Sequence, residues 1–229
     1  MCSIAGAKNQ ETTEKLLEFT SHRGSSTAVK EKGGITLGHV LHSVVGAVEQ
    51  PLESDSMLST NCEIYNWKEL SEKHGIDADN DADLLHKLLD KKGINALEKI
   101  DGIYAFAWIK NGELVLARDK MGVNPLWYSE EGIEFCSEKQ ALEKQGIECR
   151  ELHPRRIMRI DLETGERNFE QRDFFEIDER EVDAEEAAKA VAEKFLEAVE
   201  KRVPEREEVG LLFSGGVDST LIAAALQSL

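Results

Sequence analysis

The chain has 229 residues, 41% of them hydrophobic and 32% charged, and a formal net charge of -17. That length holds one large domain, or one domain and part of a second. A chain this acidic should repel phosphate backbones, which disfavours nucleic-acid binding by the chain alone. No apolar run approaches the roughly 20 residues of a membrane span, and the N-terminus lacks the basic and apolar regions of a signal peptide. We therefore expect a soluble, cytoplasmic protein with neither nucleic acid nor membrane as a partner.

The cysteine pattern argues against a metal site. The four cysteines are Cys2, Cys62, Cys136 and Cys149. None of them forms a C-x-x-C pair, so zinc and thioredoxin-like sites are disfavoured. We expect no bound metal in this part of the chain and a reducing compartment.

The first hundred residues predict helices mixed with strands. A buried strand is expected at 2–7, at the very start of the chain, and a helix at 10–19. Four leucines at positions 84, 85, 88 and 89 have the i, i+3, i+4 spacing of a buried helix face, which predicts a helix over 81–92. The other elements expected here are strands at 35–40, 43–46 and 57–65 and a helix at 67–74.

The next stretch is rich in strands. Apolar runs at 103–109 and 113–117 flank Asn111-Gly112, and Asn-Gly between two such runs is a strong hairpin signal. Further strands are expected at 125–128, 132–136, 156–161 and 167–174. Because no regular βαβ alternation occurs up to this point, the sequence predicts an α+β domain.

The composition changes at about residue 177. A long amphipathic helix is expected over 182–202 and ends at Pro204. The segment 208–213 has the continuous apolar character of a buried strand in a parallel sheet. A loop and then a helix from about 218 follow. The sequence therefore predicts two domains, 1–176 and 177–229, and the second is an incomplete α/β domain.

The loop at the second domain has features of a phosphate site. Its residues are Ser214, Gly215, Gly216, Val217, Asp218 and Ser219. Two glycines let backbone N–H groups point at an anion, and the following helix adds its positive N-terminal end. The alternative is a tight turn without a ligand. The loop lacks the final Gly-Lys-Ser/Thr of a Walker loop, so a kinase-like site is not expected.

Cys2 is a candidate nucleophile. Met1 is followed by a small residue, the pattern from which the initiator methionine is usually removed. Removal would leave Cys2 with both a thiol and a free α-amine, and this amine, with a reference pKa of about 7.7–8.0, can act as general base for the thiol. The alternative is that Cys2 is only a small buried residue.

A series of ordered motifs favours the catalytic interpretation. The chain resembles the glutamine-hydrolysing asparagine synthetase family over its whole length. The resemblance is carried by Cys2-Ser3-Ile4-Ala5-Gly6, His22-Arg23-Gly24, Leu37-Gly38-His39, Asn61-Cys62-Glu63-Ile64-Tyr65-Asn66, Asp81, Asp101-Gly102-Ile103-Tyr104-Ala105-Phe106-Ala107, Leu116 to Leu126, Ser137-Glu138 and the 214–219 loop.

The resemblance implies a fold. The first 176 residues would form a four-layer αββα N-terminal-nucleophile hydrolase sandwich. The remainder would be an α/β stub of an adenine-nucleotide α-hydrolase-like domain, whose 214–219 loop holds the pyrophosphate of ATP. ATP with Mg²⁺ would serve the synthetase half, incompletely bound by this chain. Glutamine and ATP are the implied partners, with aspartate as the default acceptor and a homodimer as one assembly to consider.

The resemblance also implies residue roles. Cys2 would attack the side-chain amide of glutamine, and the Asn61 amide and the N–H of Cys62 would hold the oxyanion. Backbone groups of Glu63 and the carboxylate of Asp81 would bind the substrate α-ammonium. The alternatives are that Asn61 and Glu63 are polar strand-end residues and that Asp81 caps the helix over 82–92, a role compatible with substrate binding.

Three residues depart from the family at this site. The family usually has glycine where this chain has Ser3 and Cys62, and it has a carboxylate-binding arginine where this chain has Leu41. A second hypothesis follows, in which the fold survives as a scaffold or an ammonia-dependent variant that does not use glutamine. A third, smaller hypothesis is a reversible disulfide between Cys62 and Cys2, which requires their Cα atoms to lie within about 7 Å.

Overall fold

The computed structural model describes residues 2–42, 48–177, 179, 181–203 and 209–229. The chain forms two compact units, Met1–Phe174 and Phe175–Leu229. The strand expected at 43–46 and the helix end expected at Pro204 lie outside the described residues. Among the helices of the described ranges, none is long and apolar enough to cross a membrane.

Two antiparallel sheets form the centre of the first unit. One sheet has the order β10 (Cys149–Glu151), β8 (Trp127–Ser129), β9 (Phe135–Cys136), β1 (Ser3–Ala7), β3 (Ile35–Leu41), β2 (Ser26–Lys32). The other has the order β12 (Arg167–Gln171), β11 (Arg156–Asp161), β7 (Glu113–Arg118), β6 (Gly102–Lys110), β5 (Met57–Ile64), β4 (Leu52–Glu53). The strands at 26–32, 52–53 and 149–151 were not predicted from the sequence.

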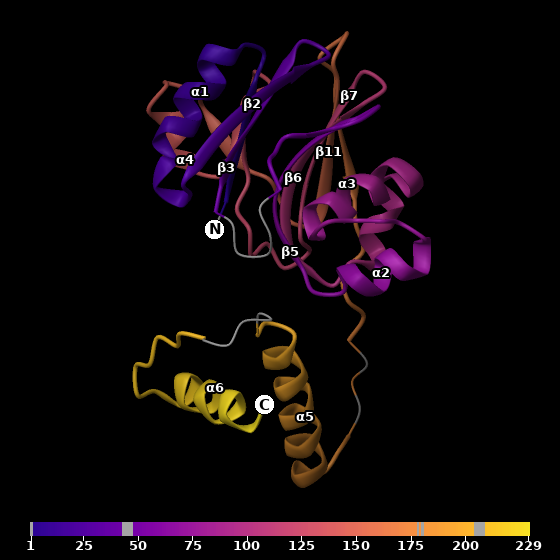
Figure 1. The fold of residues 1–229 in the computed structure, drawn as a ribbon, viewed down its shortest axis with the longest axis vertical. Coiled ribbons are helices and arrows are strands. Elements are labelled where there is room, and N and C mark those ends of the chain that lie inside the picture. The colour runs from indigo at the N-terminus through magenta and orange to yellow at the C-terminus, as the bar shows by residue number, and fades with distance from the viewer. Residues whose placement is uncertain (1, 43–47, 178, 180, 204–208) are drawn as a thin grey trace. The chain divides into compact units, whose positions relative to one another are not determined.

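Helices cover the outer faces of both sheets (Figure 1). One sheet carries α1 (Gln10–Phe19) and α4 (Lys139–Glu143), and the other carries α2 (Trp67–His74) and α3 (Asp81–Lys92). Short 3₁₀ turns follow α1 and α3 at Ser21–Arg23 and Gly93–Lys99. The predicted four-layer αββα sandwich is therefore confirmed for this unit.

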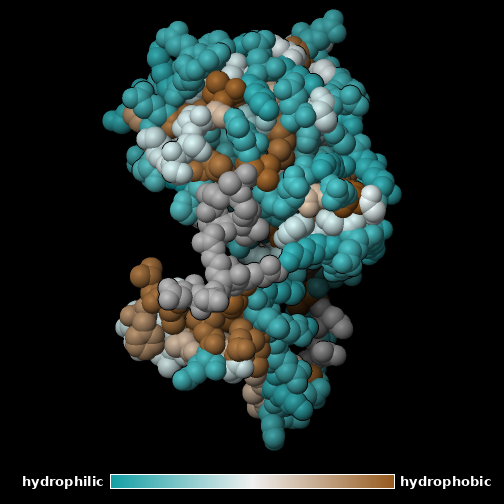
Figure 2. Space-filling model, viewed as in Figure 1, coloured by the Kyte–Doolittle hydropathy of each residue, from teal (hydrophilic) through white to brown (hydrophobic). Residues whose placement is uncertain are grey.

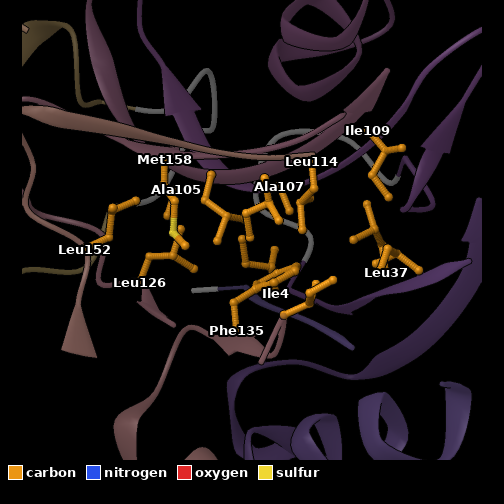
Figure 3. Packing of buried hydrophobic residues seen from close by; sticks show 14 of the residues in the cluster. Ile4, Leu37, Ala105, Ala107, Ile109, Leu114, Leu126, Phe135, Leu152 and Met158 are labelled. Atoms are coloured by element: carbon orange, nitrogen blue, oxygen red, sulfur yellow. The ribbon is translucent and has the colours of Figure 1, made fainter. Parts of the chain in front are cut away.

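The core lies between the two sheets. Figure 3 shows Ile4, Leu37 and Phe135 of one sheet pointing toward Ala105 and Met158 of the other. All five of these side chains are at most 2% exposed. Burial on both faces of the β1 strand fixes its position at the middle of its sheet, with β9 on one side and β3 on the other.

Local signals in the sequence account for several elements. The predicted hairpin is confirmed, because β6 and β7 pair through Lys110 and Glu113 around a turn in which Asn111 and Gly112 have φ values of 52° and 78°. Such positive values at both central positions are typical of a type I′ turn. The α1 helix begins after Asn9, whose side chain accepts a hydrogen bond of 2.8 Å from the Thr12 N–H.

The second unit contains two helices, α5 (Ala184–Glu200) and α6 (Val217–Ser228), in its described part. The strand expected at 208–213 is wrong for residues 209–213, which form no strand. A strand exists only by pairing, and the described part of this unit offers no second strand. Apolar side chains of the segment 209–213 lie at the surface of this unit (Figure 2), with Leu212 97% exposed and Phe213 61% exposed.

Candidate active site

A pocket of about 290 Å³ opens where the ends of β1, β3 and β5 meet. It brings together all six residues that the sequence predicted for catalysis and substrate binding. They are Cys2, Leu41, Asn61, Cys62, Glu63 and Asp81. These residues come from separate stretches of the chain, which the two sheets place side by side.

Cys2 lies immediately before the central strand β1. Because β3 runs antiparallel to β1, with Ser3 opposite Val40, the end of β3 lies beside Cys2. The His42 N–H donates a hydrogen bond of 3.3 Å to the Cys2 Sγ. Burial raises the pKa of the Cys2 thiol above its usual value, and the His42 N–H lowers it in part. The thiol is therefore protonated at neutral pH and requires a base to attack a carbonyl.

The His22-Arg23-Gly24 motif holds the Cys2 backbone in place. Arg23 Nε donates a 3.0 Å hydrogen bond to the Cys2 carbonyl, and Arg23 Nη1 donates one of 3.0 Å to Glu138. A Cβ on Gly24 would clash with the backbone carbonyl of Leu41, so only glycine permits this close approach. The motif was predicted only as part of the resemblance, without a role.

Two hydrogen bonds join the sheets just behind the pocket. His39 Nε2 donates a hydrogen bond of 3.1 Å to the Thr60 carbonyl, and Ser59 Oγ donates one of 2.9 Å to the Gly38 carbonyl. Burial lowers the pKa of His39 to about 4, so its ring is neutral near neutral pH and Nε2 carries the proton. The strand that ends beside Cys2 is thereby tied to the strand that carries Asn61.

Asn61 presents a buried amide to the pocket. The residue is 5% exposed, and its Nδ2 has no hydrogen-bond partner among the residues that the structure describes. Its backbone carbonyl accepts a 2.9 Å hydrogen bond from Asn124 Nδ2. An unpartnered buried donor costs about 1–3 kcal/mol unless something accepts from it. This donor is therefore available to an oxygen atom of a molecule in the pocket.

Asn124 is a site residue that the sequence reasoning did not single out. Asp119 accepts hydrogen bonds from the N–H groups of Val123 and Asn124, at 3.0 and 3.1 Å. These bonds shape the loop that brings the Asn124 amide to Asn61. The signal available in the sequence was the long motif from Leu116 to Leu126, in which both residues stand.

The open edge of β5 adds a backbone donor. On this edge, the Thr60 N–H donates a hydrogen bond of 2.8 Å to Gln50 Oε1, and the Ile64 N–H donates one of 3.0 Å to Asp81 Oδ2. Alternate N–H groups of a strand point the same way, so the Cys62 N–H lies on this edge, between these two. The strand β6 pairs along the opposite edge.

Asp81 is the first residue of α3 and not its cap. The N-cap is Asn80, whose Oδ1 accepts a hydrogen bond of 2.9 Å from the Asp83 N–H. The predicted capping role of Asp81 is therefore wrong. Burial raises the pKa of the Asp81 carboxyl, and the Ile64 and Ala82 N–H groups oppose this. The Cys62 Sγ contacts Asp81 Oδ2 at 3.7 Å, and burial and then this carboxylate raise the pKa of Cys62 well above its usual value.

Two further predictions concern the cysteines and Ser3. All four cysteines are free thiols in this structure, and Cys2 and Cys62 line the same pocket. The reversible disulfide between them stays a prediction.

Ser3 is fully buried, and its Oγ has no partner in the described part of the protein. The Ser3 side chain therefore places a hydroxyl that has no partner in the described structure next to Cys2.

The loop of the second unit precedes a helix, as expected. Gly215 has a φ of 76°, which favours glycine, and Gly216 is the N-cap of α6 without a side-chain capping bond. Ser219 Oγ donates a hydrogen bond of 3.1 Å to the Gly216 carbonyl. The first turn therefore keeps N–H groups that could bind an anion. Across the described residues, no group of three or more His, Cys, Asp or Glu side chains is arranged to hold a metal ion.

A four-layer αββα sandwich in which a cysteine directly precedes a central strand is the fold of N-terminal-nucleophile hydrolases. The chain belongs to the glutamine amidotransferase domain family, whose model matches residues 1–175. A second family model, asparagine synthase, matches residues 190–229.

Relatives with curated names agree with these families. A probable glutamine-hydrolysing asparagine synthetase of Acanthamoeba polyphaga mimivirus is 31% identical over 91% of this chain and 44% of its own length. Asparagine synthetase B of Escherichia coli K12 is 28% identical over 98% of this chain and 44% of its own length. The chain thus spans about half the length of the curated relatives it matches, or somewhat less.

A solved structure supports the fold. The glutamine phosphoribosylpyrophosphate amidotransferase of B. subtilis, complexed with ADP and GMP, superposes with a TM-score of 0.64. It is 20% identical, and the match covers 75% of this chain and 49% of that protein. At this identity the likeness concerns the fold alone.

Proposed function

We propose that this protein is an asparagine synthetase-like glutamine amidotransferase in which Cys2 hydrolyses the side-chain amide of glutamine. The single observation that supports this most is the buried, unpartnered Nδ2 of Asn61 in the pocket that Cys2 lines. A donor beside a nucleophile is what a developing oxyanion requires. In this proposal, residues 1–176 are the amidotransferase half and 177–229 begin a synthetase half.

The first chemical step uses the terminal amine. Once Met1 is removed, the α-amine of Cys2 takes the thiol proton, and the sulfur attacks the carbonyl carbon of the amide. Asn61 Nδ2 and the Cys62 N–H donate to the oxygen that becomes negative. The C–N bond then breaks, and the proton passes to the nitrogen, which leaves as ammonia.

Hydrolysis completes the cycle. Water attacks the thioester carbon, the C–S bond breaks, and the sulfur regains a proton, so that glutamate is released. The raised pKa of Cys2 fits this scheme, because the thiol needs the adjacent amine as a base. Asp81 and Glu63, which line the pocket, bind the α-ammonium of the substrate.

The ammonia would serve an ATP-dependent amidation, with aspartate as the acceptor. Support comes from the match of 190–229 to the asparagine synthase family and from the Ser214–Ser219 loop at the start of α6. Its glycines and helix N-terminus suit the pyrophosphate of ATP, and Mg²⁺ would arrive bound to those phosphates. A homodimer and a cytoplasmic location, where the four thiols stay reduced, complete the proposal.

The test measures ammonia and glutamate after incubation with glutamine. The wild type should release both in equal amounts, and Cys2→Ala should release neither. Cys149→Ala is the matched control, because Cys149 is also a free thiol but does not line the pocket. Mass spectrometry of the intact protein establishes whether Met1 has been removed. A processed wild type that released no ammonia would favour the scaffold or ammonia-dependent alternative.

A further inference from the structure

The described lining of the pocket contains no Lys or Arg side chain that could pair with a carboxylate, and its side-chain donors are mainly neutral amides such as those of Gln50 and Asn80. Glu63 and Asp81 supply two acidic groups to the lining, and His42 is the only described side chain there that could be positive. The sequence contains no Lys or Arg between Lys32 and Lys68, so the whole segment that supplies β3, β4 and β5 brings no permanent positive charge. A free carboxylate would therefore lose its hydration here without gaining a permanently charged side chain as a partner.

The neighbouring cation does not fill this role. Arg23 lies near Cys2 but is not among the residues that line the pocket. Its Nε is committed to the Cys2 carbonyl and its Nη1 to Glu138. Its third nitrogen, Nη2, is buried and has no hydrogen-bond partner among the described residues. The Arg23 guanidinium thus holds the Cys2 backbone and is not part of the described pocket lining.

Apolar residues stand in the lining instead. Leu41, Val48 and Ile103 all contribute to the pocket wall. Leu41 is the last residue of β3 and directly precedes His42, whose N–H contacts the Cys2 Sγ. The pocket therefore places the apolar Leu41 close to the nucleophile and also contains the two acidic residues of β5 and α3.

The remaining groups still fit an amine and an amide. The Asn61 Nδ2 is buried, lacks a partner in the described structure and lines the pocket, so it suits the oxygen of a carboxamide. The acidic pair suits an ammonium group. For a carboxylate attached to the same carbon as that ammonium, the described lining offers two acidic neighbours and no permanently charged partner.

We propose, resting on the hydrolysis at Cys2 proposed above, that the preferred substrate is a glutamine whose α-carboxylate is capped as an amide. The class includes a glutamine residue at the N-terminus of a peptide, which keeps its α-ammonium and its side-chain carboxamide. The bond that is hydrolysed is the one between carbon and nitrogen of that carboxamide, with water as co-reactant and ammonia as product.

The test compares L-glutamine with L-glutamine α-N-methylamide. The methyl group distinguishes the two amides, because side-chain hydrolysis releases ammonia and main-chain hydrolysis releases methylamine. The free carboxylate of glutamine loses its hydration beside two acidic residues without gaining a permanently charged partner from the described lining, whereas the capped amide has no charge to desolvate. We expect kcat/KM for the capped compound to be at least about tenfold higher.

The outcomes separate this inference from the proposed function. An equal or higher kcat/KM for L-glutamine overturns the inference and leaves the hydrolysis at Cys2 intact. If neither compound releases ammonia, the proposed hydrolysis fails, and calorimetric binding to Cys2→Ala then decides the preference of the pocket. Tighter binding of the capped compound supports the inference, and tighter binding of glutamine, or no binding of either, overturns it.

A variant tests the position of the missing charge. Leu41→Arg adds a cation in the lining, and Leu41→Met is the matched neutral control. The ratio of kcat/KM for glutamine to that for the capped compound should rise at least about tenfold in Leu41→Arg and stay within about twofold of wild type in Leu41→Met. Circular dichroism and thermal unfolding confirm that both variants fold. An unchanged ratio in a folded Leu41→Arg would contradict the inference.

Discussion

Protonation of His39 should destabilise the fold in mild acid. Burial lowers its pKa to about 4, while an unperturbed histidine titrates at about 6.5. The unfolded chain therefore binds the proton more readily, and stability from this group is complete above pH 6.5 and is lost as the pH falls toward 4. At 1.36 kcal/mol per pKa unit, the full effect is about 3 kcal/mol, of which about 2.5 kcal/mol falls between pH 7.5 and 4.5.

The measurement is urea unfolding followed by tryptophan fluorescence, since all three tryptophans lie within the first unit. Other groups also titrate in this range, so the informative quantity is the difference between wild type and His39→Gln. The variant should be less stable at pH 7.5, because the bond to Thr60 changes, and should lose about 2.5 kcal/mol less on acidification. His22→Gln, at an exposed ring, is the control. Parallel pH curves for wild type and His39→Gln would refute the reasoning.

Three further predictions concern the surroundings of Cys2. Asn61→Ala should lower kcat for ammonia release by about 10²–10³-fold, and a loss confined to KM would exclude an oxyanion role. Ser3→Ala removes a buried hydroxyl that has no partner in the described structure, so it should raise the free energy of unfolding by about 1 kcal/mol; a lower value in urea titration would show that the hydroxyl is satisfied. Gly24→Ala should lower that free energy by more than about 1 kcal/mol because its Cβ would clash with the Leu41 carbonyl. Gly210→Ala is the control, because that glycine has neither a close neighbour nor a positive φ.

Elements defined by their own local chemistry were predictable from the sequence. The Asn111-Gly112 turn needs positive φ at two successive residues, and those residue types identify it without knowledge of the rest of the fold. The leucines of α3 identify its buried face in the same way, and the four of them are at most 1% exposed. In both cases the information lies within a few residues of the element.

Elements defined by a partner were not predictable in this way. The strand β2 carries Lys30, Glu31 and Lys32 along the edge of its sheet, so it lacks the apolar alternation of a half-buried strand. The opposite error occurred at 209–213, where the apolar run predicted a strand, yet the described part of that unit has no strand to pair with it. Strand formation depends on a neighbour that local sequence does not specify.

The site shows the same division. The ordered motifs predicted residues that the structure brings into one pocket, because each motif retains recognisable residue types. The bond from Asn124 to Asn61 and the bond from His39 to Thr60 join positions 63 and 21 residues apart. No periodicity or spacing specifies such pairs, and only the packed sheets reveal them.

The Cys62 thiol has a consequence beyond its own position. A carboxylate offers about four acceptor sites, and Asp81 already receives the Ile64 N–H, the Ala82 N–H and the Cys62 thiol. A glycine at position 62 would leave about two sites for an ammonium group, whereas the thiol leaves about one. If Asp81 binds an ammonium group as proposed, the contact should be weaker here than beside a glycine, and Glu63, which also lines the pocket, should contribute more to amine binding. In the proposed function, Leu41 and Cys62 together should shift recognition away from the two charged groups of free glutamine and toward its side-chain amide.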